Sequence, residues 1–142
     1  MGNKFKVKSD ATCVEAVIYG KNMKEVFENS AFGMYASIGK PDKESKRVSM
    51  KITSTANNTE DLLMSFLRDL LHYYLVRKIL IRGITVMSLT ENKVHAKLTG
   101  EELSRRHVIK NDIKSVKFGA ADGAAKIVET RTGYRTSLIY CL

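Results

Sequence analysis

The chain has 142 residues, and its 24 Lys and Arg outnumber its 15 Asp and Glu, which gives a formal net charge of +9. This length fits one domain, which we expect to span residues 1–142. A hydrophobic fraction of 44% and a charged fraction of 27% are typical of a globular protein, and they exclude a disordered or low-complexity chain.

Membrane and secretory features are not expected. Uninterrupted apolar runs fall far short of the ~20 residues that span a bilayer, and the segment MGNKFKVKSD has no apolar stretch of signal-peptide length. The only cysteines are Cys13 and Cys141, which excludes a disulfide-dense secreted module. We therefore expect a cytoplasmic protein with no membrane partner. The positive charge favours an acidic partner such as nucleic acid, and solubility alone is the alternative explanation.

The first predicted elements are strands followed by a helix. Residues 4–8 alternate in polarity, and residues 12–19 (TCVEAVIY) are rich in β-branched residues, so both segments predict strands. Apolar residues at helical spacing then predict a helix over 23–38. Asn22 provides a capping signal at its start, and Gly39 provides a stop signal at its end.

The remaining elements are a strand, a second helix and then strands only. The second helix is predicted over 59–78, where a broad apolar stripe indicates a face buried in the core. The later strands are predicted over 47–53, 79–89, 94–99, 125–130 and 134–142, and a further one within 108–118, which contains an alternating stretch. This order predicts an α+β fold, a two-layer sandwich with two helices packed on one face of a largely antiparallel or mixed sheet.

Motifs for catalysis and cofactor binding are absent from the sequence. There is no GxxxxGK[ST] or GxGxxG loop, no GxSxG turn and no HExxH pair. No nucleophile has a recognisable neighbouring base, so we do not expect an enzyme.

Cations are concentrated in SRRHVIKNDIKSVKF, residues 104–118. Arg106, His107, Lys110 and Lys114 belong to this segment. One interpretation is a solvated basic edge that prevents edge-to-edge strand pairing. The other is a surface that contacts phosphate or carboxylate groups.

Three stretches of the chain resemble the archease family. YGKNMKEVFENSAFGMY (19–35) is similar to that family's helix L-E-E-L-F-E-N-A-A-x-G-M-F, and LLMSFLRDLLHY (62–73) is similar to L-L-x-x-W-L-N-E-L-L. RHVIKNDIKSVKF (106–118) is similar to R-H-x-x-K-x-x-I-K-A-V-T-Y. The three occur in the family's order, and the resemblance extends over residues 9–142.

The resemblance implies a protein partner of the GTP-dependent tRNA-splicing RNA ligase. Archeases promote guanylylation of the ligase's active-site histidine and allow multiple turnovers, and an older assignment is chaperone-like modulation of a tRNA methyltransferase. Arg106, His107, Lys110 and Lys114 would then contact an anionic group of the partner. The alternative is a basic RNA-binding or chaperone-like module, acting on tRNA or a tRNA-modifying enzyme, that kept the fold and lost the ligase role.

The resemblance also implies a divalent-metal site, from which this chain departs. The family's two metal-binding Asp residues lie in an N-terminal D-H-T-A-D motif and a C-terminal I-L-D-I motif. Ungapped alignment puts Cys13 and Cys141 at these positions and Asp10 at the His position, whereas a one-residue shift aligns Asp10 with the start of the first motif. Thiols are poor ligands for Ca²⁺ or Mg²⁺, so the family's calcium-type cation is not an expected cofactor here.

Family geometry would bring the two cysteines close together and leave three outcomes open. They could pack as buried thiols, form a disulfide, or hold a soft metal ion with a further ligand such as His107.

Overall fold

The protein is described by a computed structural model that covers residues 5–9, 13–40, 42, 45–105, 107–119 and 126–142. In chain order its elements are β1 (Phe5–Ser9), β2 (Cys13–Gly20), α1 (Met23–Ile38), β3 (Arg47–Thr55), α2 (Thr59–Leu75), β4 (Ile79–Leu89), β5 (Lys93–Glu102), β6 (Ser115–Phe118), β7 (Ile127–Thr130) and β8 (Gly133–Cys141). Neither helix in this part of the chain has the length and apolar character needed to cross a membrane.

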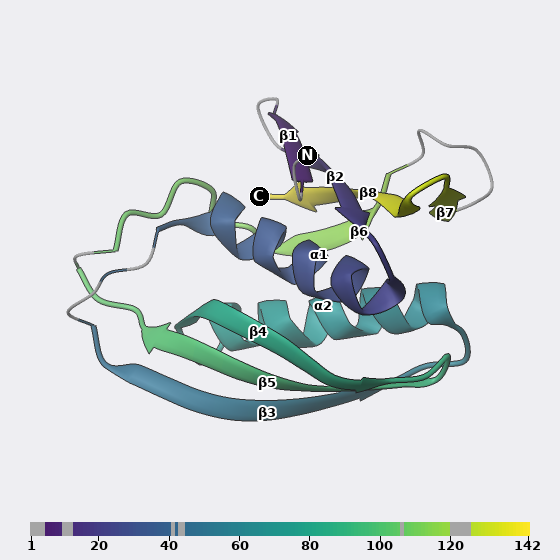
Figure 1. Cartoon of the computed structure of the whole chain (residues 1–142). Coiled ribbons are helices and arrows are strands. Elements are labelled where there is room, and N and C mark those ends of the chain that lie inside the picture. Colours follow the sequence, from purple (N-terminus) through teal and green to yellow (C-terminus); the bar gives the residue numbers. More distant parts are fainter. Residues whose placement is uncertain (1–4, 10–12, 41, 43–44, 106, 120–125) are drawn as a thin grey trace.

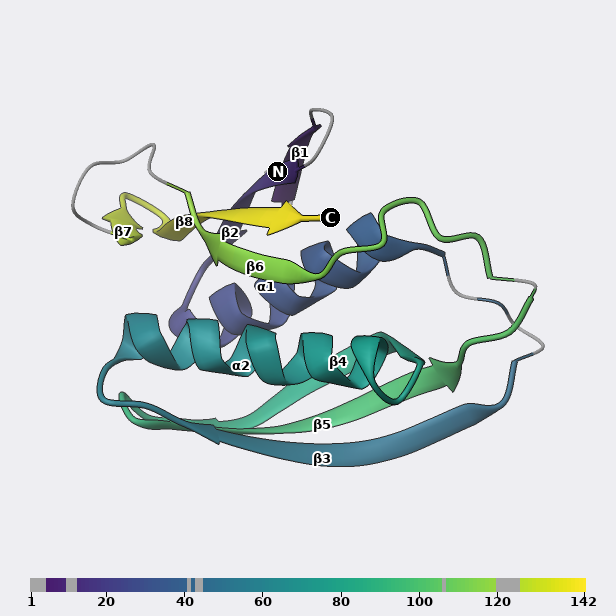
Figure 2. The same ribbon diagram turned by 180° about the vertical axis from the view of Figure 1, so that it is seen from behind.

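The two helices lie between two antiparallel sheets (Figures 1 and 2). One sheet has the order β1-β2-β8-β6, with β7 also paired to β8, and the other has the order β3-β5-β4. The α+β class, with helices packed on antiparallel strands, is therefore confirmed. The structure adds a sheet on the opposite side of the helices, because each helix is apolar over more than one face. The helix α2, for example, buries eight side chains: Leu62, Leu63, Met64, Phe66, Leu67, Leu70, Leu71 and Tyr74.

Polar caps set the starts of both helices. The side chain of Asn22 accepts a hydrogen bond from the Glu25 backbone N–H at 2.9 Å, which satisfies one of the unpaired donors of α1. The cap of α2 is Asn58, whose side chain accepts from the Asp61 N–H at 2.8 Å. The helix α2 ends at Leu75, three residues before the predicted end at residue 78, where a backbone φ of 57° at Lys78 turns the chain into β4.

The apolar core fills the space between the helices and both sheets. Phe27 of α1 and Phe66 of α2 are completely buried, with ring centroids 5.7 Å apart. Tyr140 of β8 is also completely buried, and its hydroxyl donates to the Ser30 carbonyl oxygen of α1 at 3.3 Å. Each fully buried large apolar side chain stabilises the fold by roughly 1.5–3 kcal/mol, so these contacts fix how the elements around the candidate site are placed.

The segment 107–114 crosses the C-terminal end of α1. The strand expected within 108–118 is β6, residues 115–118, because the preceding residues hydrogen-bond the end of this helix instead. The Lys110 N–H donates to the Ile38 carbonyl oxygen at 2.7 Å, and the Asn111 side-chain amide donates to the Ser37 carbonyl oxygen at 2.7 Å. These bonds satisfy helix-end acceptors that have no partner within the helix.

Candidate functional site

Cys13 and Cys141 form a disulfide at the end of the β2–β8 ladder. They are direct cross-strand partners, with Cα atoms 4.2 Å apart. The Lys114 backbone N–H donates to the Cys141 carbonyl oxygen at 2.8 Å, which ties the start of β6 to the same point. The fold thus brings the two positions that the resemblance assigns to metal binding into covalent contact.

The donor atoms at this end of the sheet do not fit a divalent cation. Both sulfur atoms are committed to the disulfide, so neither is a thiolate, and a hard cation requires oxygen ligands. Asp10 lies outside the described residues, and within those that are described no group of three or more His, Cys, Asp or Glu side chains could hold a metal ion. His107, the further ligand considered for a soft metal, is bonded to other residues.

Glu101 is a completely buried carboxylate with three hydrogen-bond donors around it. Its Oε1 accepts from the Asp42 backbone N–H at 2.8 Å and contacts Nε2 of His107 at 3.0 Å. Its Oε2 accepts from Nη1 of Arg82 at 3.1 Å. A buried charge of this kind is tolerated only when it is paired and hydrogen-bonded, and here each oxygen has a partner.

The bonds around His107 define its tautomer. The Ser104 backbone N–H donates to Nδ1 at 3.0 Å, so Nδ1 is the acceptor and Nε2 carries the hydrogen that is donated to Glu101. The side chain of His107 is only 1% exposed. It therefore holds Glu101 in place, and we assign it a positioning role instead of direct contact with a partner.

The side chains present here are those of a serine–histidine–acid catalytic triad, namely Ser104, His107 and Glu101, but their geometry differs from that of a triad. The Ser104 hydroxyl lies 3.3 Å from Nδ1, whose lone pair already accepts the backbone N–H of the same residue. Glu101 is also paired with the guanidinium of Arg82. The arrangement is therefore suited to fixing Arg82, and it does not activate the hydroxyl as a nucleophile.

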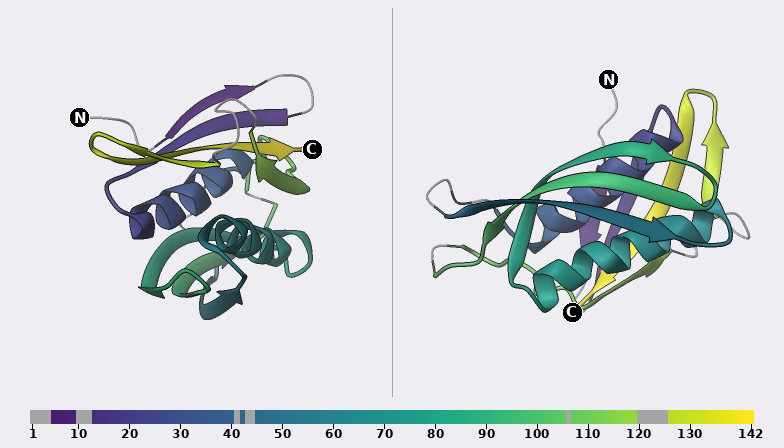
Figure 3. Two further views of the ribbon diagram at one scale, coloured as in Figure 1. Left: turned by 90° about the vertical axis from the view of Figure 1, so that its right-hand side faces the viewer. Right: turned by 90° about the horizontal axis from the view of Figure 1, so that it is seen from below.

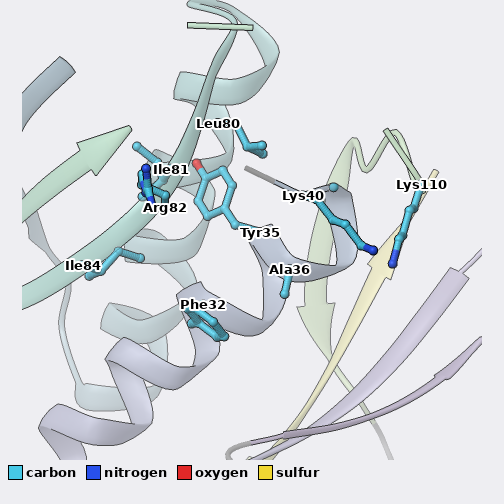
Figure 4. Close-up of a pocket in the computed structure, with 10 residues that line it drawn as sticks. Phe32, Tyr35, Ala36, Lys40, Leu80, Ile81, Arg82, Ile84 and Lys110 are labelled. Carbon is cyan, nitrogen blue, oxygen red and sulfur yellow. The ribbon is translucent and has the colours of Figure 1, made fainter. Parts of the chain in front are cut away.

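Arg82 lines a cavity of about 480 Å³ between α1, β4 and the 107–114 segment. Lys40 and Lys110 line the same cavity, and Figure 4 shows their ammonium groups turned toward one another, across from Arg82. Most of the other lining side chains are apolar or aromatic, among them Tyr35 and Ile84. Three cations beside apolar lining side chains suit a ligand or partner group that combines an anion with an apolar part.

Lys114 does not line this cavity and belongs to a separate surface cluster. Its Nζ lies 2.9 Å from Oδ2 of Asp112, whose Oδ1 accepts from the Tyr74 hydroxyl at 2.7 Å. The hydrogen bond from Tyr74, followed by that from Lys114, lowers the pKa of Asp112. Burial, followed by the bond to Asp112, raises the pKa of Tyr74, so the phenol stays protonated.

Of the four residues expected to contact an anion, the structure therefore places Lys110 in the cavity and His107 behind it. Arg106 lies outside the described residues. Sequence reasoning did not identify Arg82, Glu101 or Lys40. Arg82 sits at an irregularity of β4, where the register shifts between Ile81 and Gly83, and a single sequence carries no signal for such a shift.

Comparison with known proteins agrees with this architecture. The Archease protein family (MTH1598/TM1083) matches residues 6–139. Protein archease of Methanosarcina acetivorans is 24% identical over 143 residues, covering 97% of this chain and 95% of that protein, and Protein archease of Methanosarcina barkeri gives the same values. The solution structure of Methanobacterium thermoautotrophicum protein 1598 aligns with a TM-score of 0.67 and 21% identity, covering 98% of this chain and 99% of that one.

The fold and the site define a small α+β protein with a cation-lined cavity. The buried carboxylate of Glu101 holds one of these cations, Arg82, in place. Because the family match extends over most of the sequence, the chain belongs to the archease family.

Proposed function

We propose that this protein is an accessory factor of the GTP-dependent tRNA-splicing RNA ligase, promoting guanylylation of the ligase and its multiple turnover. The observation that carries the proposal is the archease family match across residues 6–139. In this role the protein binds and orients groups of the ligase, and the bond-making chemistry belongs to the ligase.

The cavity between α1 and β4 supports a contact surface for this role. Lys40, Arg82 and Lys110 present positive charge, and the adjacent side chains of Val108 and Ile109 are 66% and 37% exposed. Apolar side chains next to cations suit a protein interface in which a carboxylate or phosphate of the ligase meets the cavity. The Glu101–His107 pair would hold Arg82 ready for that contact.

This activation would not use a metal ion at the Cys13–Cys141 end of the sheet. In this proposal the disulfide stands where the resemblance places the family's oxygen ligands, and its sulfur atoms cannot serve as such ligands. The family's calcium-type cation is therefore given no part in the proposed mechanism.

The test is guanylylation of the ligase from the same organism, followed with labelled GTP and sub-stoichiometric amounts of this protein. We expect faster labelling and more than one ligation turnover per ligase. The double variant Lys40→Gln/Lys110→Gln should lose most of the stimulation. The matched control Lys21→Gln/Lys24→Gln removes the same charge from exposed positions outside the cavity and should retain it.

Two results would contradict the proposal in different ways. If the protein gives no stimulation of a ligase that responds to another archease, the function is wrong. If the parent protein stimulates the ligase and both double variants lose this stimulation equally, the function stands and the assignment of the cavity is wrong.

A further inference from the structure

The outward face of the β3-β5-β4 sheet is basic. Side chains alternate along these strands, so that Ile52, Ala96 and Leu98 are buried toward the helices while their neighbours face outward. The outward positions include Lys51 and Lys97, and the other residues that share this face are chiefly Ser and Thr. The right panel of Figure 3 shows this sheet from below, with its strands crossing in front of α1 and with α2 alongside them.

The positive charges on this face have no acidic side chains exposed beside them in the described strands. Lys51 of β3 and Lys97 of β5 are directly opposite cross-strand partners, and both are exposed. Lys93 is exposed on the same side of β5, opposite Thr55. Like charges directly opposite one another destabilise a sheet. None of the exposed outward residues within the described strands β3, β4 and β5 is acidic, so the face is suited to an external polyanion.

The hydroxyl groups on this face favour a sugar–phosphate backbone as that polyanion. Thr85 of β4 lies opposite Lys97, and Thr53 lies opposite His95, with its Oγ1 2.6 Å from Nδ1 of that ring. Serine and threonine hydroxyls bond phosphate oxygens and the ribose 2′-hydroxyl, and lysines neutralise phosphates. The outward positions carry no Phe, Tyr or Trp in these described strands, so the stacking platform that binds unpaired bases is missing here.

We propose that the outward face of the β3-β5-β4 sheet binds the backbone of duplex RNA without reading its sequence. Double-stranded RNA is recognised mainly through shape, phosphates and 2′-hydroxyl groups, which matches a face of lysines and hydroxyls. Lys51, Lys93 and Lys97 do not line the cavity, so this RNA-binding activity is separate from the proposed ligase contact.

The experiment is fluorescence anisotropy of a labelled RNA duplex of about 16 base pairs, titrated with the full chain at several salt concentrations. Three neutralised phosphates predict a slope of log K against log salt of about −3 or steeper. The triple variant Lys51→Gln/Lys93→Gln/Lys97→Gln should flatten the slope by about 2 to 3 and weaken binding at least tenfold at low salt. It should also melt no lower than the parent, because a like-charge pair is removed.

A variant with the same charge change elsewhere provides the control. Lys21→Gln/Lys24→Gln/Lys117→Gln alters exposed lysines outside this sheet and should keep the parent slope. The proposal is overturned if both variants lose binding equally or if the parent does not bind the duplex. It is also overturned if single-stranded RNA of the same length binds more tightly, or if anionic phosphatidylserine vesicles bind and the duplex does not.

Discussion

His107 Nε2 lies 3.0 Å from Glu101 Oε1, and the exposed fractions of the two side chains are 1% and 0%. The contact joins the 107–114 segment to β5 and occupies the carboxylate oxygen that does not face Arg82. A change at either residue would therefore alter how Arg82 is held without replacing any residue that lines the cavity.

The variant Glu101→Gln tests this relationship. A glutamine oxygen can still accept from His107, but its amide nitrogen would face the Arg82 donor and cannot accept from it. We expect a loss of about 1–3 kcal/mol in unfolding free energy, measured by urea denaturation. Guanylylation stimulation should fall to the level of Arg82→Gln. If Glu101→Gln stimulates normally while Arg82→Gln does not, the carboxylate does not position the guanidinium.

Gly39 is predicted to be intolerant of a side chain. A Cβ added there would lie 2.6 Å from the Val108 carbonyl oxygen, and Gly39 pairs with Ile109 in an isolated bridge. Gly39→Ala should push the 107–114 segment away from α1 and destabilise the protein by roughly 1–3 kcal/mol. Gly83→Ala is the control, because its Cβ would meet only the Thr99 Cβ at an ordinary 3.7 Å. Equal melting temperatures for the two variants would contradict this prediction.

The disulfide is predicted to be a major source of stability. It links residues separated by 128 positions, and the chain-entropy model gives at most about 5 kcal/mol for a loop of that length. Urea denaturation of the parent should shift to lower concentration when reductant is added. The Cys13→Ser/Cys141→Ser variant should unfold at that lower concentration with or without reductant. A reduced parent, verified by thiol titration, that unfolds at the original midpoint would contradict the prediction.

Calcium is predicted not to stabilise this protein, because its disulfide offers no oxygen ligand. The variant Cys13→Asp/Cys141→Asp places carboxylates at the same cross-strand positions and should gain a calcium-dependent increase in melting temperature, since a ligand that binds only the folded state stabilises it. Thermal melts with and without calcium check both statements. A calcium-dependent increase in the parent would show that other residues bind the ion.

Stability in acid should depend on Asp112. Its folded pKa is lowered by the Tyr74 and Lys114 hydrogen bonds. Its contribution is therefore fully present above the unfolded pKa of about 4 and is lost as pH falls through the folded pKa. Because the side chain is 61% exposed, the effect should stay under about 1 kcal/mol.

Urea unfolding from neutral to acid pH measures this contribution. Asp112→Asn should lose less stability on acidification than the parent, and Tyr74→Phe should reproduce most of that change because its bond is the largest cause of the pKa shift. Parallel pH profiles for the parent and Asp112→Asn would contradict the prediction.

The strands and helices could be predicted because their local signals agree with the final packing. The β-branched residues of 12–19 and the helical spacing from Met23 to Ile38 correspond closely to β2 and α1. The segment 108–118 also alternates, but its first half contacts the end of α1 instead of pairing as a strand. Local periodicity could not reveal this, because the competing acceptors come from a helix about 70 residues earlier.

The candidate site was less predictable than the fold. Lys110 was identified from the basic segment, whereas its cavity partners Lys40 and Arg82 lie in distant elements with no motif of their own. Glu101 lies beyond the end of the strand predicted over 94–99, and in the folded protein Asp42, Arg82 and His107 enclose it. Its burial depends on tertiary contacts that no local pattern encodes.

The bond between Cys13 and Cys141 closes the chain between them into one covalent ring. A protease that cuts a single peptide bond within the ring opens it but releases no fragment, and only a second cut or a reductant separates the pieces. The strand β1 precedes Cys13 and lies outside the ring, held to β2 by its ladder of backbone pairs. A single cut just before Cys13 can therefore detach β1 from an otherwise covalently closed molecule.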